Sequence, residues 1–555
     1  MTGAGARRWC LAALACNALG AAGCAPASAS GGPGVGPDGM PIRDAVVRVG
    51  SFATVSAIAV SPQRAFVVAD GGLAIYDRNR RGWMPPLPLG SAGPRSPLVR
   101  EPCAAATNLI GDALWIACGS RVTVVRPALG AVWATDVGQQ VSALAVDRSG
   151  ADAYALGRMV VVVSATGTSR PLAPGETLAP DRIADRVGVG GDPALFQMVS
   201  DPLLLRDDAL HVWQPSAVAR GEGAGEAWVG TRGGGVFLAD LDFHRARQLP
   251  FGLRAGMVRA VARTATGVIV VEDPAPWSAD RSLVTTASDD LATWEWPSLY
   301  ISLGALSAVA AREGTLCAAG ELGAGLASMA PLAASPSAPL PNDHRVFERA
   351  AVVLATPRGC AVGTERGIAL LRWSSSDSAS GVVRSPVTLP PVLALAASGD
   401  TLWIGTTGGL YRTTDSTLTP MLVRLPASIS PAVVALAVTN DGLAIASTSE
   451  LWIGSGAART AAFARTAAPV TRVGRLTALA ADDRALWVGG TNGALAFSEP
   501  LGNAVTVALD EPTVMAPPPL GGREVRSLAL APDVAWVATA AGLVRVRRGP
   551  DGLPR

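Results

Sequence analysis

Lysine is absent from this sequence, and histidine, tyrosine and cysteine are scarce. All 46 basic residues are arginine, and the 555 residues include 3 His, 4 Tyr and 7 Cys. The absence of lysine excludes chemistry that depends on a lysine amine, such as Schiff-base formation. The formal net charge is only +2, so no bulk field attracts polyanions. We therefore expect no nucleic-acid partner.

Patterns that would mark a catalytic or metal site are missing as well. The three histidines, His211, His244 and His344, share no metal-ligand spacing. No Gly-x-Ser-x-Gly sequence joins an expected strand to a helix, and we predict no helices. The glycines at 233–235 lie between two expected strands, which predicts a hairpin turn and not a phosphate-binding loop. We expect no catalytic residues, no metal and no cofactor.

A short β-rich unit recurs along almost the whole chain. It reads Leu-Trp-Ile-Gly-Thr-Thr-Gly-Gly-Leu-Tyr at 402–411, and related sequences stand at 227–236, 486–493 and 535–543. An apolar run and a polar turn precede each copy, and a Gly-rich turn leads into a third apolar run. Short β-rich runs separated by such turns predict an antiparallel meander. Because the tryptophans repeat at equivalent positions, we interpret them as packing residues.

The spacing of the unit predicts the fold. Most positions equivalent to the tryptophan are about 40 to 50 residues apart, the length of a four-stranded propeller blade. The longer step from Tyr154 to Trp228 predicts a degenerate copy near 195–205 or an inserted loop. We predict an all-β β-propeller protein of about eleven to twelve blades, in two tandem rings because one ring holds about four to eight. The equivalent positions are Phe66, Trp115, Tyr154, Trp228, Ile269, Cys317, Ala361, Trp403, Ala444, Trp487 and Trp536.

The stretch at 327–342 is rich in Pro and Ser, a composition typical of linkers. It predicts a first propeller at 46–326 and a second at 343–555. The blades would then divide unevenly, so the alternative is that the stretch is a long loop and the ring boundary lies elsewhere. The apolar strand at 46–49 is a candidate to close a ring by pairing with a distant strand.

The unit at 402–411 resembles the two-component regulator propeller repeat, whose signature is Leu-Trp-Ile-Gly-Thr followed by Gly-Leu. The resemblance covers about residues 50–548 and is strongest at Trp228, Trp403 and Trp487. It implies propellers outside the cell that act as the sensor half of a membrane histidine kinase. No kinase region follows the last unit, so we expect a stand-alone propeller protein.

A second resemblance is confined to residues 288–294, Ser-Asp-Asp-Leu-Ala-Thr-Trp. They resemble the Asp-box hairpin turn of sialidase-type propellers, with Leu291 in place of the expected glycine. The resemblance implies a structural turn and no activity.

The N-terminus predicts export. Arg7 and Arg8 precede a short apolar core, as in a signal peptide, and 21–24 (Ala-Ala-Gly-Cys) resembles a bacterial lipobox. We predict a lipoprotein signal at 1–24 with Cys24 as the lipid anchor, followed by a flexible tether at 25–45. Ordinary cleavage shortly after Cys24 is the alternative. The expected location is the outer membrane or periplasm of a Gram-negative bacterium, with membrane contact only through the lipid.

Four cysteines follow Cys24, and an oxidising compartment permits disulfides. Cys103 and Cys118 fall in the expected first and second strands of one blade, so they are the favoured pair. Cys317 and Cys360 occupy equivalent positions in successive blades and form a second candidate pair. The alternative for both pairs is that they are buried free thiols.

Acidic and aromatic residues are concentrated between 272 and 296. Glu272, Asp273, Asp280, Asp289, Asp290 and Glu295 form the densest acidic cluster. We interpret it as a solvated surface, with a calcium site as the alternative. Trp277, Trp294 and Trp296 are candidates for a sugar platform, or else they are core residues.

The turns between second and third strands carry the variable residues of the unit. In a propeller these turns open on the face that usually binds the ligand, so we predict this face as the binding surface. The candidate binding residues are Asp70, Arg232, Glu365, Arg366, Thr407 and Asn492.

The sequence favours an exported, non-enzymatic propeller that binds or scaffolds a polysaccharide, a small ligand or an envelope protein. One alternative is a propeller enzyme acting on polysaccharide, of sialidase-like or lyase-like type. Another is a periplasmic sensor that passes a signal to a separate two-component kinase.

Overall fold

The computed structural model describes most of the chain from residue 46 onward. The described residues are 46–87, 89, 103–129, 131–176, 178, 183–207, 210–223, 225–273, 283–297, 303–312, 315–328, 345–373, 381–414, 416–440, 442–455, 462–465, 470–498, 504–507 and 524–555. The predicted signal at 1–24 with Cys24, the tether at 25–45, and His344, Asp280 and Trp277 lie outside them.

The described residues form antiparallel sheets, ten with four strands and one with five. Within most sheets consecutive strands pair in chain order, as the predicted meander requires. Every position equivalent to the repeat tryptophan falls in the second strand of its sheet. The prediction of an all-β propeller fold is therefore confirmed.

The first four sheets, from β2 to β18, form what we call the N-terminal circuit. Its strands are β2 (Val55–Val60), β3 (Arg64–Ala69), β4 (Gly72–Asp77), β5 (Gly82–Leu87); β6 (Ala104–Thr107), β7 (Leu114–Cys118), β8 (Arg121–Arg126), β9 (Ala131–Asp136); β10 (Ala143–Asp147), β11 (Asp152–Leu156), β12 (Val160–Ser164), β13 (Ser169–Pro171), β14 (Ile183–Gly188); β15 (Pro215–Arg220), β16 (Glu226–Thr231), β17 (Val236–Asp240) and β18 (Arg245–Leu249).

The remaining seven sheets form the C-terminal circuit. Its strands are β19 (Val258–Arg263), β20 (Gly267–Glu272), β21 (Leu283–Ser288), β22 (Trp294–Glu295); β23 (Leu306–Arg312), β24 (Thr315–Gly320), β25 (Gly323–Ser328), β26 (Arg345–Val346); β27 (Ala350–Ala355), β28 (Gly359–Thr364), β29 (Ile368–Arg372), β30 (Val382–Arg384); β31 (Val392–Ser398), β32 (Thr401–Thr406), β33 (Gly409–Thr414), β34 (Met421–Val423); β35 (Ala435–Thr439), β36 (Gly442–Ala446), β37 (Leu451–Ser455), β38 (Ala462–Arg465); β39 (Leu476–Ala481), β40 (Leu486–Gly490), β41 (Gly493–Phe497), β42 (Ala504–Val507); and β43 (Val525–Leu530), β44 (Val534–Thr539), β45 (Gly542–Arg547) with β1 (Val46–Val49).

In the N-terminal circuit the first strands β15, β2, β6 and β10 contact one another in that order. In the C-terminal circuit the contacts run from β19 through β23, β27, β31, β35 and β39 to β43, which returns to β19. Strand β1 pairs with β45, with Val49 opposite Leu543, and completes the last sheet. The predicted closing role of 46–49 is therefore confirmed, because a strand from the start of the chain covers the edge left by the end of the chain.

The N-terminal circuit contains a helix between its third and fourth sheets. Helix α1 (Pro193–Val199) begins after Asp192, whose side chain caps two backbone N–H groups, with proline in the first turn. Leu195, Val199 and Leu205 pack against the sheet of β15–β18. The long step from Tyr154 to Trp228 therefore holds a helical segment in place of a degenerate blade. The prediction that the chain has no helices is wrong here, because seven residues are too few for a helical apolar pattern to be recognised.

The Pro/Ser-rich stretch lies inside one sheet and not between the circuits. Residues 329–344 are outside the described part, but β25 and β26 on either side pair, with Ala324 opposite Val346. This corrects the predicted linker at 327–342 and supports the alternative of a long loop. Composition marks a loop, but it does not reveal whether the flanking strands pair with each other.

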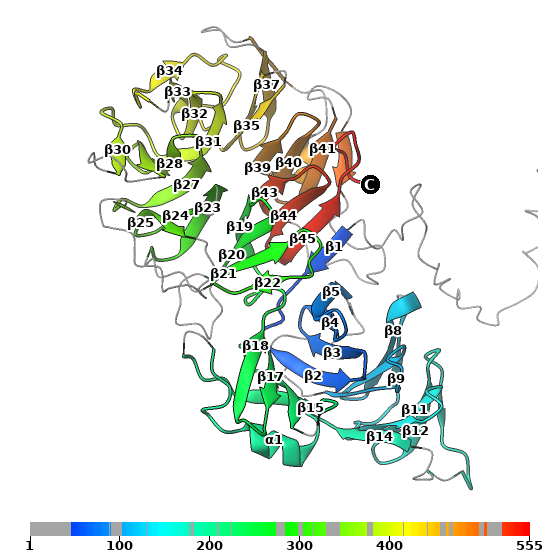
Figure 1. The fold of residues 1–555 in the computed structure, drawn as a ribbon. Coiled ribbons are helices and arrows are strands. Elements are labelled where there is room, and N and C mark those ends of the chain that lie inside the picture. Colours follow the sequence, from blue (N-terminus) through cyan, green and yellow to red (C-terminus); the bar gives the residue numbers. More distant parts are fainter. Residues whose placement is uncertain are drawn as a thin grey trace, which may run out of the picture.

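The chain passes between the two circuits twice, and the two passages lie side by side. It leaves β1 for β2 through residues 50–54, and it returns from β18 to β19 through 250–257. The Phe52 N–H donates to the Leu253 carbonyl at 2.8 Å, and the Leu253 N–H donates to the Gly50 carbonyl at 3.2 Å. The N-terminal circuit is therefore inserted after the first strand of the C-terminal circuit, and Figure 1 shows β1, β5 and β22 at the junction.

Aromatic rings fill the junction. The Phe251 ring lies 4.7 Å from Phe52, 4.5 Å from Trp83 and 5.5 Å from Trp294, centroid to centroid. Trp83 belongs to β5 and Trp294 to β22, so this cluster joins one sheet of each circuit in a common core. Close approach is possible because Gly252 lies against the Phe52 ring, where a Cβ would come within 2.5 Å.

The repeated motif is used for packing between sheets. The indoles of Trp115, Trp228, Trp487 and Trp536 are almost completely buried. The motif glycine that follows, such as Gly489, faces the first strand of the next sheet, where a Cβ would lie 2.4 Å from Val525. The interpretation of the tryptophans as packing residues is confirmed for these four copies.

Both candidate cysteine pairs are disulfides in the structure. Cys103 and Cys118 join the start of β6 to the end of β7 within one sheet. Cys317 in β24 and Cys360 in β28 join the second strands of neighbouring sheets, and both are fully buried. The second disulfide therefore links sheets as well as strands.

Replacing Phe52 with alanine should weaken the connection between the circuits. Truncation of a buried phenylalanine costs about 3–5 kcal/mol, so we expect Phe52→Ala to lower the urea midpoint of tryptophan fluorescence. Phe243→Ala is the matched control, because that ring is 72% exposed and its loss should change stability by about 0.5 kcal/mol or less. Equal midpoints for the two variants would show that the junction core contributes no stability.

Candidate functional site

A buried threonine hydroxyl closes several of the turns between second and third strands. Thr406 Oγ1 donates to the Gly409 carbonyl at 2.9 Å and accepts the Gly408 N–H at 3.1 Å. Thr231 and Thr539 make the same kind of bond with Gly235 and Gly542. The motif threonine is thus structural, and only the residues at the turn tip are available to a ligand.

The six predicted binding residues all lie at these turn tips, and all six are exposed. Asp70 and Arg232 belong to the N-terminal circuit, in the turns after β3 and β16. Glu365, Arg366, Thr407 and Asn492 belong to the C-terminal circuit, in the turns after β28, β32 and β40. The structure therefore divides the predicted set between two circuits.

The two passages connect the faces that carry these turns. β1 ends opposite Leu543, beside the turn between β44 and β45, and β2 begins opposite Ala69, beside the turn that holds Asp70. β18 likewise ends opposite Val236, close to Arg232. The turn faces of both circuits are thus adjacent to the junction.

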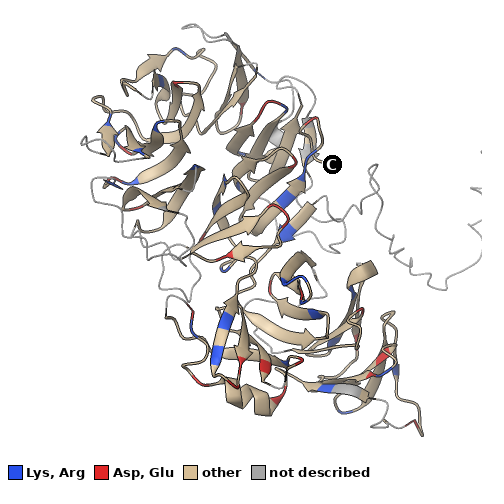
Figure 2. Ribbon diagram, viewed as in Figure 1, with Lys and Arg blue, Asp and Glu red and all other residues tan. Residues whose placement is uncertain are grey.

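The charged members of the set differ in their surroundings. The Glu365 carboxylate pairs with Arg349 at 3.3 Å, and both side chains are exposed. The side chains of Arg232 and Arg366 have no ion-pair partner within the described part of the chain. Figure 2 shows basic and acidic residues interspersed over both circuits, in agreement with the small net charge. Arg232 and Arg366 therefore offer hydrogen-bond donors at single positions, and they do not belong to a large positively charged patch.

Among the described members of the acidic cluster, Glu272, Asp273, Asp289 and Asp290 contact different partners. Asp273 pairs with Arg259 and Arg526, each at 2.7 Å, and so ties β19 to β43 where the C-terminal circuit closes. Asp289 pairs with Arg263 through both carboxylate oxygens. No group of three or more His, Cys, Asp or Glu side chains in the described residues is arranged to hold a metal ion. The carboxylates of Asp273 and Asp289 are used within the fold.

The sequence does not show that Glu272 differs from the other acidic residues of this cluster. It is fully buried at the end of β20, where it accepts hydrogen bonds from the Thr285 hydroxyl at 2.5 Å and the Ala255 N–H at 2.6 Å. Burial raises the pKa of this carboxyl. Since Ala255 lies in the second passage, Glu272 anchors that passage to the first sheet of the C-terminal circuit.

The Asp-box-like turn is structural, as its resemblance implies. Asp290 accepts from the Ala292 N–H and the Ser288 hydroxyl, and these hydrogen bonds lower the pKa of its carboxyl. Leu291 has a φ of 63° where glycine is usual, and its side chain is completely buried in the junction core. The positive φ is unfavourable for a leucine, and burial of its side chain in the junction core offsets this cost.

The tryptophans beside this turn do not form a sugar platform. Trp294 is buried and donates its indole N–H to the Leu291 carbonyl. Trp296 is half-buried and donates to the Gly252 carbonyl at 3.0 Å. Both indoles face the junction, so the interpretation as packing residues is supported.

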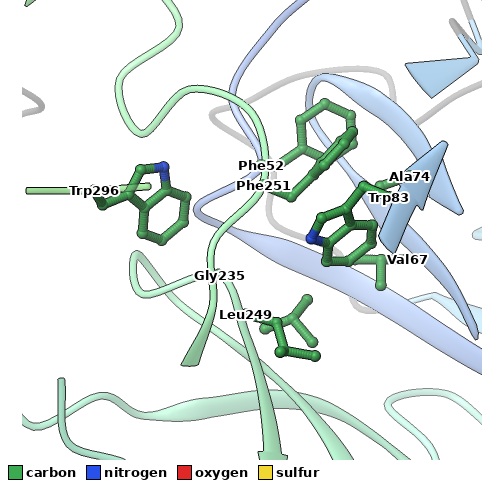
Figure 3. A pocket seen from close by; sticks show the side chains of 9 residues that line it. Phe52, Val67, Ala74, Trp83, Gly235, Leu249, Phe251 and Trp296 are labelled. Carbon is green, nitrogen blue, oxygen red and sulfur yellow. The ribbon is translucent and has the colours of Figure 1, made fainter. Parts of the chain in front are cut away.

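Figure 3 shows a small hollow at the junction, lined by Phe52, Trp83, Leu249, Phe251 and Trp296 among others. It has no room for a water molecule. The hollow is therefore part of the packed core and not a ligand site.

None of the described helices is long and apolar enough to cross a membrane.

No family model and no curated protein matches the sequence. Solved structures similar to this chain include the extracellular domain of the putative hybrid two-component system BT3049 from B. thetaiotaomicron, with 12% identity, 89% of this chain and 75% of that chain covered, and a TM-score of 0.40. The computationally designed Ika8 protein has 13% identity, 61% and 96% coverage, and a TM-score of 0.39. YCF48 bound to D1 peptide has 12% identity, 55% and 96% coverage, and a TM-score of 0.39. Similarity at this level does not identify a function.

The buried carboxyl of Glu272 predicts a pH dependence. Its pKa is higher in the folded chain than in the unfolded chain, so the folded state holds the proton more tightly. Its contribution to stability is therefore present below the ordinary glutamate pKa, about 4.3, and is lost as the pH rises through the folded pKa. We expect the stability difference between Glu272→Gln and wild type to shift in favour of the variant as pH rises, measured by urea unfolding. The exposed Glu295→Gln variant is the control, and a pH-independent difference for Glu272→Gln would contradict the assignment.

Proposed function

We propose that this chain is an exported, non-enzymatic binding module, whose ligand contacts the faces formed by the turns between second and third strands. The observation that carries the proposal is the separation of roles within the repeat. The tryptophan and glycine of the motif pack between sheets, and its threonine closes the turn. The adjoining residues at the turn tips are exposed.

Arg232 and Arg366 are the proposed principal contacts. Each is an exposed guanidinium on a turn held by a buried threonine. A guanidinium offers five N–H donors in a planar fork and binds carboxylates and other anions well. Because the threonine hydrogen bonds hold the backbone of both turns, little of its conformational entropy is lost when a ligand binds. Asp70, Thr407, Glu365 and Asn492 supply further polar contacts on the same faces.

Removal of both guanidinium groups tests this proposal. We expect Arg232→Ala/Arg366→Ala to lose about tenfold or more in affinity for whichever glycan, polysaccharide or envelope protein binds the wild-type chain in array screens. The control is Arg80→Ala, since Arg80 is 88% exposed and lies in the turn between β4 and β5, at the opposite end of its sheet. An unchanged affinity for the double variant, or an equal loss for the control, would contradict the assignment, and turnover of a bound glycan would contradict the non-enzymatic part.

Export through a lipid anchor at Cys24 is part of the proposal. The two disulfides, Cys103–Cys118 and Cys317–Cys360, support an oxidising compartment. The proposed location is the periplasmic side of the outer membrane.

Fractionation of cells tests the anchor. We expect the wild-type chain in the membrane fraction and the Cys24→Ser variant outside it, because the thioether-linked lipid requires the cysteine sulfur. Cys10→Ser is the matched control within the same leader. Equal partition of wild type and Cys24→Ser would contradict lipidation.

A further inference from the structure

Exposed apolar side chains are gathered on one part of the C-terminal turn face. Leu322 is 54% exposed, Phe347 66%, Val387 43% and Leu422 63%. They belong to three consecutive sheets, those of β23–β26, β27–β30 and β31–β34. We call these four residues the apolar arc.

Backbone contacts connect the loops that carry the arc. Leu322 stands in the turn before Gly323, which lies directly against the backbone of Val346 and Phe347. The Glu365 N–H donates to the Arg349 carbonyl at 3.4 Å, which places the next turn tip close to Phe347 along the chain.

The second half of the arc follows in the same way. The Arg366 carbonyl accepts from the Leu389 N–H at 3.1 Å, and Gly367 lies beside the Val387 carbonyl. At the third sheet, a Cβ on Gly409 would lie 3.4 Å from Leu422 Cδ1. The polar tips Glu365, Arg366 and Thr407 thus alternate with apolar side chains that the sequence did not single out.

This concentration is specific to one side of the circuit. Among the described residues from β35 to β45, only Val505 is a large apolar side chain that is exposed, at 39%. A contiguous exposed apolar surface on a folded protein marks an interaction site more often than scattered residues do.

The charges along the arc indicate the character of the partner. Glu365 pairs with Arg349 at 3.3 Å, and Glu348 pairs with Arg384 at 2.5 Å. Arg366 has no ion-pair partner in the described part of the chain. The surface therefore combines apolar side chains with the guanidinium of Arg366, and the exposed carboxylate of Glu321 stands next to Leu322.

We propose that the apolar arc with Arg366 is a docking surface for a segment of another protein that carries apolar side chains next to a carboxylate. When the apolar side chains of the arc and of a partner pack together, apolar surface of both is removed from water, which favours binding. Sugar rings stack on flat aromatic faces, and the arc has one aromatic ring among four side chains. This inference rests on the proposed function and selects a protein partner from the classes named there.

The test uses synthetic peptides in which Leu or Phe alternates with Asp, and a matched set with Lys in place of Asp. We expect the mature wild-type chain to bind the Asp set at least about tenfold more tightly than the Lys set. Phe347→Ser/Leu422→Ser should lose the Asp set by about tenfold or more, and Arg366→Gln should remove the preference for Asp over Lys. Leu129→Ser/Met198→Ser is the matched control, because these exposed side chains, 53% and 57%, lie in the N-terminal circuit. Circular dichroism confirms that each variant is folded.

Each other outcome overturns the inference in a distinguishable way. Absence of binding to the Asp set, together with glycan binding that depends on Arg232 and Arg366, would overturn the protein partner and leave the proposed function standing. Self-association that Phe347→Ser/Leu422→Ser abolishes would show that the occupant is a second copy of the chain. Failure of peptides and glycans alike would overturn both the inference and the proposed function.

Discussion

The packing of Phe251 against Phe52, Trp83 and Trp294 is the interaction on which the arrangement of the molecule depends. Phe52 and Phe251 belong to the two passages between circuits, and the tryptophans belong to one sheet of each circuit. Besides this core, the circuits are joined by the two passages and by the Trp83 N–H, which donates to the Ala292 carbonyl at 3.2 Å. The cluster therefore joins the two circuits and places their turn faces beside a common junction.

Closure of the C-terminal circuit follows from the same insertion. β1 pairs with β45 before the chain enters the N-terminal circuit, so the last sheet is completed by the first strand. Asp273, held by Arg259 and Arg526, adds a charged contact across the same closure. Buried Glu272 then connects this region to the second passage through Ala255. Closure, junction and buried carboxyl are therefore neighbouring parts of one structural unit.

The repeat leaves little freedom for function outside the turn tips. Its tryptophan fills the space between sheets, its glycine admits the next first strand, and its threonine closes the turn. A propeller built in this way varies its surface without altering its core. The exposed arginines and the apolar arc occupy the positions that packing does not use, which is why both proposals concern the turn face.

The sequence by itself determined the blade fold, the closing role of 46–49, the two cysteine pairs and the structural nature of the Asp-box-like turn, because each depends on local period, turn chemistry or equivalent positions in a repeat. It also located the six exposed turn-tip residues, although their role in binding remains a prediction. Only the tertiary structure decided that 327–342 interrupts a sheet, that α1 replaces a blade, and that the predicted site residues divide between two circuits. The apolar arc was also hidden, since Leu322, Phe347, Val387 and Leu422 come from different strands and loops. Which strands pair across a loop, and which distant side chains share a face, depend on long-range contacts that composition and periodicity do not encode.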